Sequence, residues 1–188
     1  MVQTPAKPIT LDEFLALPET KPASEFIDQV ILQKPMPQGQ HSTIQAELVT
    51  TLNALGKPQH LAWAFPELRC TFGNRSIVPD IAVFSWDHLP TNPDGTIANL
   101  FQRPPDWTIE ILSPEQSIAK VTKNIIYCLN HGTQLGWLII PSEQLVFVYH
   151  PNRAPQFFES QSDPLPTLAM LSDLNLTVGQ LFDWLRVN

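Results

Sequence analysis

Two carboxylates lie in apolar segments of the sequence, where an acid needs a partner. Asp80 follows Val78-Pro79 and precedes an apolar run, and Glu110 interrupts the largely apolar residues 106–112. Burying an unpaired carboxylate is costly, so such groups are hydrogen-bonded, paired with a cation or bound to a metal. Two hard oxygen donors suit Mg²⁺, which keeps several waters and takes substrate phosphate oxygens as its other ligands. The pair therefore predicts a metal site for phosphodiester hydrolysis.

A nearby lysine would complete such a site, because an ammonium can orient the attacking water and offset developing charge. Residues 118–129 have apolar residues at helical spacing, and this expected helix carries Lys120 and Lys123. Lys120 falls nearly opposite the apolar stripe. Lys123 flanks the stripe, and from there a long stem can reach a polar site along apolar surface. The spacing favours Lys123, although a solvated helix lysine explains this residue about equally well.

The other candidate residues also have structural explanations. Glu25 is compatible with a strand-edge acid paired with a lysine, and Asp80 alone is typical of a Pro-Asp turn. His41 falls at the start of an expected helix, where capping or packing explains it at least as well as a phosphate contact. Glu67 precedes an expected strand, and its spacing does not require it to approach the site. The sequence leaves these alternatives open.

The surrounding pattern predicts one α/β domain over residues 1–188, with helices flanking a mixed sheet. Pro79 lacks a backbone donor and favours a strand start, which places Asp80 near an accessible rim. If residues 78–84 and 106–112 form neighbouring strands, Asp80 and Glu110 can converge. The expected helices cover residues 11–17, 41–55, 118–129 and the segment after Thr177, and the expected strands cover 25–28, 30–33, 61–65, 68–72, 78–84, 107–112, 135–140 and 145–149.

The composition describes a globular protein, with 43% apolar and 15% charged residues, and excludes a disordered chain. No apolar run reaches the roughly 18 residues of a membrane span. The N-terminus lacks the pattern of a signal peptide, so a cytoplasmic protein without a membrane partner is expected. Cys70 and Cys128 then read as reduced core thiols. The net charge of -7 counts against broad nucleic-acid binding, although a bound metal adds local positive charge.

Several motifs follow one another in a fixed order between about Leu11 and Tyr149. They are Glu25-Phe26-Ile27-Asp28, His41, Val78-Pro79-Asp80, Asp106-Trp107-Thr108-Ile109-Glu110-Ile111-Leu112-Ser113-Pro114, Lys123-Asn124-Ile125-Ile126-Tyr127, Gly132 and Gly136-Trp137-Leu138-Ile139. This order resembles a bacterial family of putative restriction endonucleases within the PD-(D/E)XK nuclease superfamily. The resemblance implies a restriction-endonuclease-like, mixed four-stranded core sheet flanked by helices, with an N-terminal helix and β-hairpin as an extension. It also implies Mg²⁺ or Mn²⁺ as cofactor and DNA as substrate.

The same resemblance assigns roles by position. It implies Asp80 and Glu110 as metal ligands, with the Ile111 carbonyl as a third candidate. Lys123 corresponds to a catalytic lysine that has moved from the strand to the following helix. Glu25 corresponds to the acid of the first conserved region and is a candidate contact of a second metal.

The chain departs from the family pattern at three positions. Leu112 stands where the superfamily motif has lysine, Ala119 where the family commonly has an acid, and Gln29 where glycine is common. These departures motivate an alternative function, a catalytically weakened nuclease-fold module that binds DNA or another protein. Hydrolysis of other phosphate esters is a third hypothesis. A homodimer is expected, because cutting both strands of a duplex is simplest with two symmetric sites.

Overall fold

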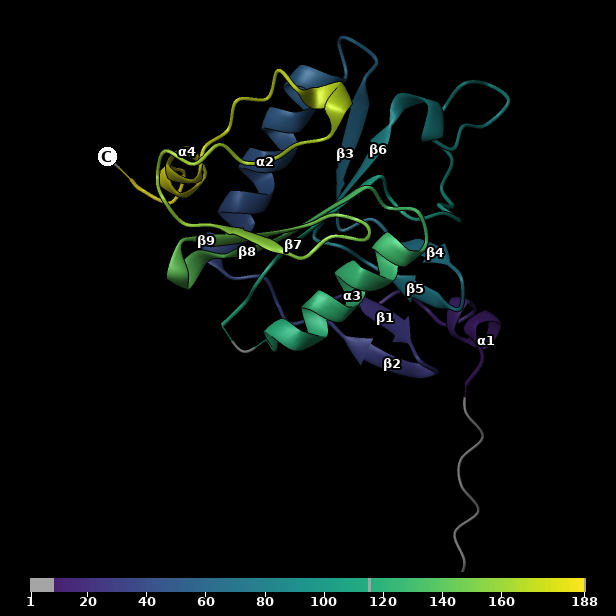
Figure 1. Ribbon diagram of the computed structural model, residues 1–188. Helices are drawn as coiled ribbons and strands as arrows, with labels where there is room; N and C mark the ends of the chain where they lie inside the picture. Colours follow the sequence, from purple (N-terminus) through teal and green to yellow (C-terminus); the bar gives the residue numbers. More distant parts are fainter. Residues whose placement is uncertain (1–8, 115, 188) are drawn as a thin grey trace, which may run out of the picture.

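The computed structural model describes residues 9–114 and 116–187, which form two sheets and four α-helices (Figure 1). The six-stranded sheet has the order β10-β9-β8-β7-β6-β3, and the four-stranded sheet has the order β2-β1-β5-β4. The helices are α1 (Leu11–Leu15), α2 (Gly39–Gly56), α3 (Ile118–Asn130) and α4 (Val178–Asp183). The strands are β1 (Ser24–Ile27), β2 (Val30–Gln33), β3 (Ala62–Pro66), β4 (Cys70–Phe72), β5 (Arg75–Ile77), β6 (Ile81–Ser85), β7 (Trp107–Ile111), β8 (Leu135–Ile140), β9 (Leu145–Tyr149) and β10 (Gln156–Phe158).

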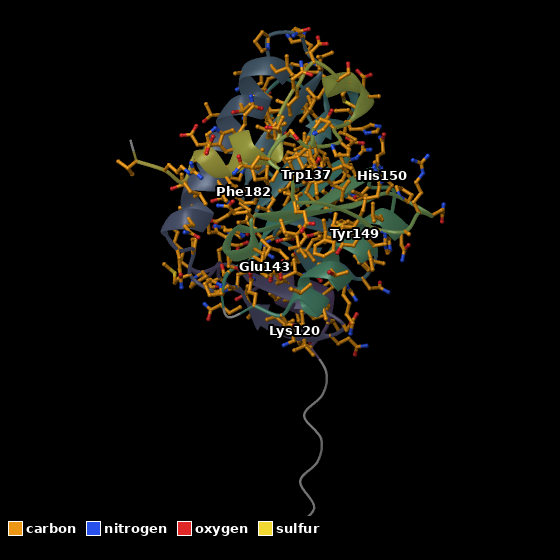
Figure 2. The ribbon with its side chains drawn as sticks, turned by 60° about the vertical axis from the view of Figure 1, so that its left-hand side comes forward. Lys120, Trp137, Glu143, Tyr149, His150 and Phe182 are labelled. Carbon is orange, nitrogen blue, oxygen red and sulfur yellow. The ribbon has the colours of Figure 1, made fainter. Side chains whose placement is uncertain are left out.

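The six-stranded sheet is mixed and buried on both faces. Strands β7 and β8 pair in parallel through the crossover helix α3, and the other pairs of this sheet are antiparallel. Helix α2 covers one face and α3 the other (Figure 1). Trp137 and Phe182 lie on the α4 side of the sheet, and Tyr149 lies on the α3 side (Figure 2). This double cover explains why all five residues of β7 are buried, including the polar Thr108 and Glu110.

The four-stranded sheet packs beside α3, away from α2 (Figure 1). Its Cys70, Phe72 and Ile77 share a buried cluster with Phe84 of β6. The β1–β2 hairpin turns through Asp28 and Gln29, whose φ angles are 52° and 64°. Left-handed backbone at both central residues is the geometry of a type I′ turn, which favours glycine. This explains why a glycine is common where this chain has Gln29.

The predicted strand over residues 78–84 is wrong at its start. The structure has two strands here, β5 and β6, in different sheets, and Val78 to Asp80 form the connection between them. Pro79 cannot donate a ladder hydrogen bond, which accounts for the interruption. Asp80 therefore lies immediately before β6, at the point where the chain passes from one sheet to the other.

Some of the other predictions from the sequence are confirmed and others are wrong. The expected helices at residues 11–17 and after Thr177 both begin with a capping box, at Thr10 and Thr177, and Cys70 and Cys128 are free and buried as expected. The core sheet has six strands instead of the implied four, because β9 and β10 extend it. Ile118, placed in the apolar stripe of α3, is 42% exposed. Across residues 9–114 and 116–187, no helix has the length and apolar character needed to span a membrane.

The close packing of α3 on β8 depends on Gly136. A Cβ atom at this position would overlap Cγ2 of Ile125 and lie 3.5 Å from Cβ of Tyr149. We expect Gly136→Ala to lower the free energy of unfolding by about 1–3 kcal/mol, because this core has no room for an added methyl group. Urea denaturation followed by far-UV circular dichroism measures the change.

The matched control is Gly39→Ala at the start of α2, where an added Cβ would meet no atom within 4 Å. Its free energy of unfolding should stay the same or rise by up to about 1 kcal/mol, since alanine favours helix. Equal effects of the two substitutions would contradict the packing argument.

Candidate active site

The pairing of β6 with β7 brings the two predicted acids together. Ile81 lies opposite Ile109, and Ala82 lies opposite Thr108. Continuing this antiparallel register by one residue places Asp80 beside Glu110. Their residues are only 3% and 6% exposed, so each carboxylate needs a partner within the protein. The predicted convergence of the two acids therefore has a direct basis in the strand register.

The cation that contacts both acids is Lys34. Its Nζ donates to Oδ1 of Asp80 at 2.6 Å and to the Val78 carbonyl at 2.7 Å, and it lies 3.5 Å from Oε2 of Glu110. Lys34 directly follows β2, and its own N–H donates to the Ala23 carbonyl, which extends the hairpin ladder. The end of the hairpin thus delivers an ammonium from the small sheet to the acids of the large sheet.

Asp80 has further partners on its second carboxylate oxygen. Oδ2 accepts a hydrogen bond of 2.7 Å from the Ile111 N–H and lies 3.1 Å from Nε2 of His41. The side chain of Gln45 donates to the Asp80 carbonyl at 2.7 Å. His41 and Gln45 both come from the first turns of α2, so this helix fixes the position of Asp80. Nδ1 of His41 is buried and has no hydrogen-bond partner among the described residues.

Glu25 lies at the same junction, and it is 7% exposed. Its Oε1 accepts a hydrogen bond of 2.8 Å from the Val78 N–H, which anchors the connection between β5 and β6. Burial raises the pKa of the Glu25 carboxyl, and the charges of Lys34 and the Val78 N–H offset only part of this effect. Glu25 therefore contributes to the electrostatics of the site and also holds the backbone next to Asp80.

The three central groups influence one another's ionisation. Burial alone would raise the pKa of Asp80, but the Lys34 ammonium, His41 and the Ile111 N–H hold it below its ordinary value. Burial raises the pKa of Glu110 well above its ordinary value, and Lys34 only partly opposes this. Burial also disfavours the Lys34 ammonium, yet Asp80 and Glu110 together raise the pKa of Lys34 above its usual range. Asp80 and Lys34 are thus held as a charged pair, and Glu110 takes up a proton more readily than an ordinary glutamate.

The predicted catalytic lysine lies elsewhere on the surface. Lys123 is exposed on α3, as is Lys120, and within the described part of the chain Lys123 forms no hydrogen bond or ion pair with Asp80 or Glu110. Lys34 was not predicted from the sequence as a residue of this site. A signal was present, because Leu32 pairs with Glu25 in the hairpin and Lys34 falls on the same face two residues later.

An open cavity of about 360 Å³ leads from the surface to this cluster. Lys34, His41 and Asp80 form its inner wall, and Glu67, which the sequence left unassigned, lies on its lining. The remaining lining residues come from the loop before β1, the segment after β2 and the segment after β7: Glu19, Thr20, Lys21, Pro22, Ala23, Pro35, Met36, Pro37, Ser113 and Gln116. A substrate can therefore approach Asp80 and Lys34 from solvent.

The donor set fits a hard divalent cation that keeps part of its water shell. One oxygen of Asp80 and one of Glu110 face the same ammonium, so their separation cannot exceed the sum of their distances from Nζ. Within residues 9–114 and 116–187, no three His, Cys, Asp or Glu side chains are already arranged to hold a metal ion. An ion bound here would replace the ammonium between the two acids, with water completing its coordination.

Removing the ammonium tests how far the fold depends on it. We expect Lys34→Met, measured by urea denaturation in the presence of a chelator, to lower the free energy of unfolding by about 3–5 kcal/mol, because two buried acids lose their counter-charge. The loss should be smaller at pH 5 than at pH 8, since protonation removes the uncompensated charge.

The control is Lys123→Met, which removes an exposed ammonium on α3 and should change stability by no more than about 0.5 kcal/mol. If Lys34→Met is as stable as the parent at pH 8, the fold does not depend on the Lys34 ammonium.

This chain is similar to proteins described as putative nucleases. The family model of Uma2, described as "Putative restriction endonuclease", matches residues 11–179. The crystal structure of a putative nuclease belonging to DUF820 from Anabaena variabilis ATCC 29413 has 58% sequence identity and a TM-score of 0.94. That similarity covers 95% of this chain and 100% of the other. No curated protein is significantly similar in sequence. The restriction-endonuclease-like fold is thereby confirmed, and the chain belongs to the Uma2 family of putative restriction endonucleases.

Proposed function

We propose that this protein is a divalent-metal-dependent endonuclease that hydrolyses phosphodiester bonds in DNA. The observation that carries the proposal is the convergence of Asp80 and Glu110 on the Lys34 ammonium at the inner wall of an open cavity. Membership of a nuclease family supports the reaction class. In this proposal Mg²⁺ or Mn²⁺ binds to the two acids, where it polarises the scissile phosphate and lowers the pKa of the attacking water.

The protein's own groups have distinct roles in this proposal. The Ile111 N–H and His41 fix one oxygen of Asp80, which leaves the other oxygen directed toward Glu110 and Lys34. The Ile111 carbonyl remains the candidate for a third ligand. Lys34, once released from the acids, stays close to them through the Val78 carbonyl and can donate to a phosphate oxygen or to the attacking water. Glu25 positions the Val78 backbone.

DNA is compatible with an acidic chain if positive charge gathers at the site. The net charge of -7 leaves little general attraction for phosphate. The cavity lining carries Lys21, Lys34 and His41 beside the acids Glu19, Glu67 and Asp80. A bound divalent ion would supply the additional positive charge that attracts phosphate. We further propose that the protein acts in the cytoplasm, a reducing compartment in which the free cysteines Cys70 and Cys128 would stay reduced.

Two lysines are candidates for the catalytic ammonium. Lys34 contacts both acids directly. Lys123 retains the role that the family resemblance suggests, on the condition that its long side chain swings from the exposed face of α3 toward the site when substrate binds. The geometry supports Lys34 as the first candidate, and variants of the two residues separate the alternatives.

One observation favours a non-catalytic role as the second candidate function. Lys34 neutralises the acids without a metal, so the same cluster could serve only to stabilise a nuclease-fold module that binds DNA or another protein. Metal affinity distinguishes this candidate from the first, because a purely structural ion pair has no need of an ion.

Metal binding is measured by isothermal titration calorimetry with Mg²⁺ and with Mn²⁺. We expect one isotherm for the parent protein and at least tenfold weaker binding for Asp80→Asn and Glu110→Gln, since each change removes one ligand charge. Glu143→Gln, which changes an exposed acid between β8 and β9 that does not line the cavity, is the control and should bind like the parent. A parent protein that binds neither ion would favour the structural module.

Cleavage is measured as nicking of supercoiled plasmid in Mg²⁺ or Mn²⁺. We expect Asp80→Asn and Lys34→Ala to lose at least a hundredfold in rate, because the first loses a metal ligand and the second the ammonium. Folding of each variant is checked by circular dichroism. If Lys123→Ala is inactive while Lys34→Ala keeps its activity, Lys123 is the catalytic lysine. Equal nicking by all variants and the parent would rule out this site.

A further inference from the structure

Strand β2 is an unprotected edge of the four-stranded sheet. The opposite edge, β4, is covered, because the Thr71 N–H donates to the Phe101 carbonyl and Cys70 forms a bridge with Phe101. Strand β2 pairs with β1 alone, and in the described part of the chain no segment pairs with its outer side. Strand edges in monomeric proteins are usually blocked by charges, proline or a covering segment. The Val-Ile-Leu-Gln sequence of β2 has none of these features.

The free hydrogen-bonding groups of β2 can be identified from the ladder. The Lys34 N–H donates to the Ala23 carbonyl across the hairpin. Since backbone groups alternate along a strand, Leu32 and Val30 also face β1. Ile31 and Gln33 therefore direct their N–H and carbonyl groups away from the sheet, as two donors and two acceptors in one row.

Exposed apolar side chains surround this edge. Both faces of β2 carry exposed apolar side chains, and α1 and the neighbouring loops add further aliphatic groups. Six side chains contribute: Leu15 at 44% exposure, Leu17 at 48%, Val30 at 52%, Ile31 at 39%, Leu32 at 40% and Met36 at 66%. If each of the six side chains buries roughly 85 Å², two such surfaces would bury about 1,000 Å² together, which is the lower limit of a specific protein interface.

A small hollow lies beside the same edge. It has a volume of about 100 Å³, and Phe14, Leu15, Leu17 and Ile31 form its apolar wall. A cavity of this size accommodates one aliphatic side chain. An apolar strand edge with an adjacent apolar hollow is a surface that fits another strand bearing Val, Ile or Leu.

We propose that two copies of this chain pair through β2 in antiparallel fashion, which joins their four-stranded sheets into one of eight strands. With a twofold axis at Leu32, Ile31 lies opposite Gln33 of the partner subunit, and the free groups form four backbone hydrogen bonds. Antiparallel pairing of identical strands is self-complementary, so the interface closes after two copies. A second copy therefore satisfies both the backbone groups and the apolar faces.

This pairing also relates the two candidate active sites. Lys34 directly follows β2, so the dimer places the two Lys34 Cα atoms about 14 Å apart along the strand direction. The twofold axis gives the two candidate sites opposite orientations. These match the opposite polarities of the two strands of a DNA duplex. This last step rests on the proposed nuclease function, whereas the pairing itself does not.

Sedimentation equilibrium of the full chain, over a range of micromolar concentrations, tests the pairing. The parent protein should have twice the mass of one chain. Ile31→Pro removes an outward N–H without breaking a bond to β1, and Leu32→Lys places two ammonium groups near the axis. Each should weaken dimerisation at least tenfold. The control is Phe157→Lys on β10, another sheet edge where the side chain is 64% exposed, and it should remain a dimer.

Circular dichroism checks folding, and Leu32→Lys decides the outcome if Ile31→Pro fails to fold. A monomeric parent protein would overturn the pairing, as would dimers that tolerate Leu32→Lys or that dissociate only with Phe157→Lys. A monomer that nicks DNA would refute the dimer and leave the nuclease proposal intact. A dimer that depends on β2 but does not nick DNA would support the pairing and refute the nuclease proposal.

Discussion

The contact of the Lys34 ammonium with two buried acids is the interaction on which the rest of this structure depends. Asp80 lies immediately before β6 and Glu110 lies within β7, and neither buried carboxylate can remain charged without compensation. The compensating charge comes from the end of the β1–β2 hairpin. One electrostatic contact therefore joins the small sheet to the large sheet, and it fixes where the hairpin meets the core.

In the proposed function, this arrangement would couple the stability of the fold to metal binding. A divalent ion and the ammonium compete for the same two oxygens, so the ion would have to displace Lys34 before it could act. The displaced lysine would remain near the two acids, where an ammonium is useful for phosphate chemistry. The same hairpin presents its outer edge to solvent. Any partner that orders β2 would also restrain the residue that directly follows it.

Much of the fold follows from local patterns. The hairpin, α2, α3 and the strands β7, β8 and β9 were predictable. The helices have apolar residues at helical spacing, β7 alternates, and β8 and β9 are apolar runs of strand length. The connection at Val78 to Asp80 was not predictable, since three residues joining two sheets look like the start of one longer strand. The proximity of Asp80 and Glu110 was also predictable, because each acid interrupts an apolar run and neighbouring strands bring such positions together.

The sequence by itself determined the chemistry that the site needs: two carboxylates in apolar strands, which require a cation. Which cation meets them was decided only by the tertiary structure. The sequence pattern favoured Lys123, but α3 directs Lys123 to solvent, whereas the hairpin crosses from the small sheet and directs Lys34 inward. Electrostatic compensation acts between segments distant in sequence, so the fold alone selects the partner.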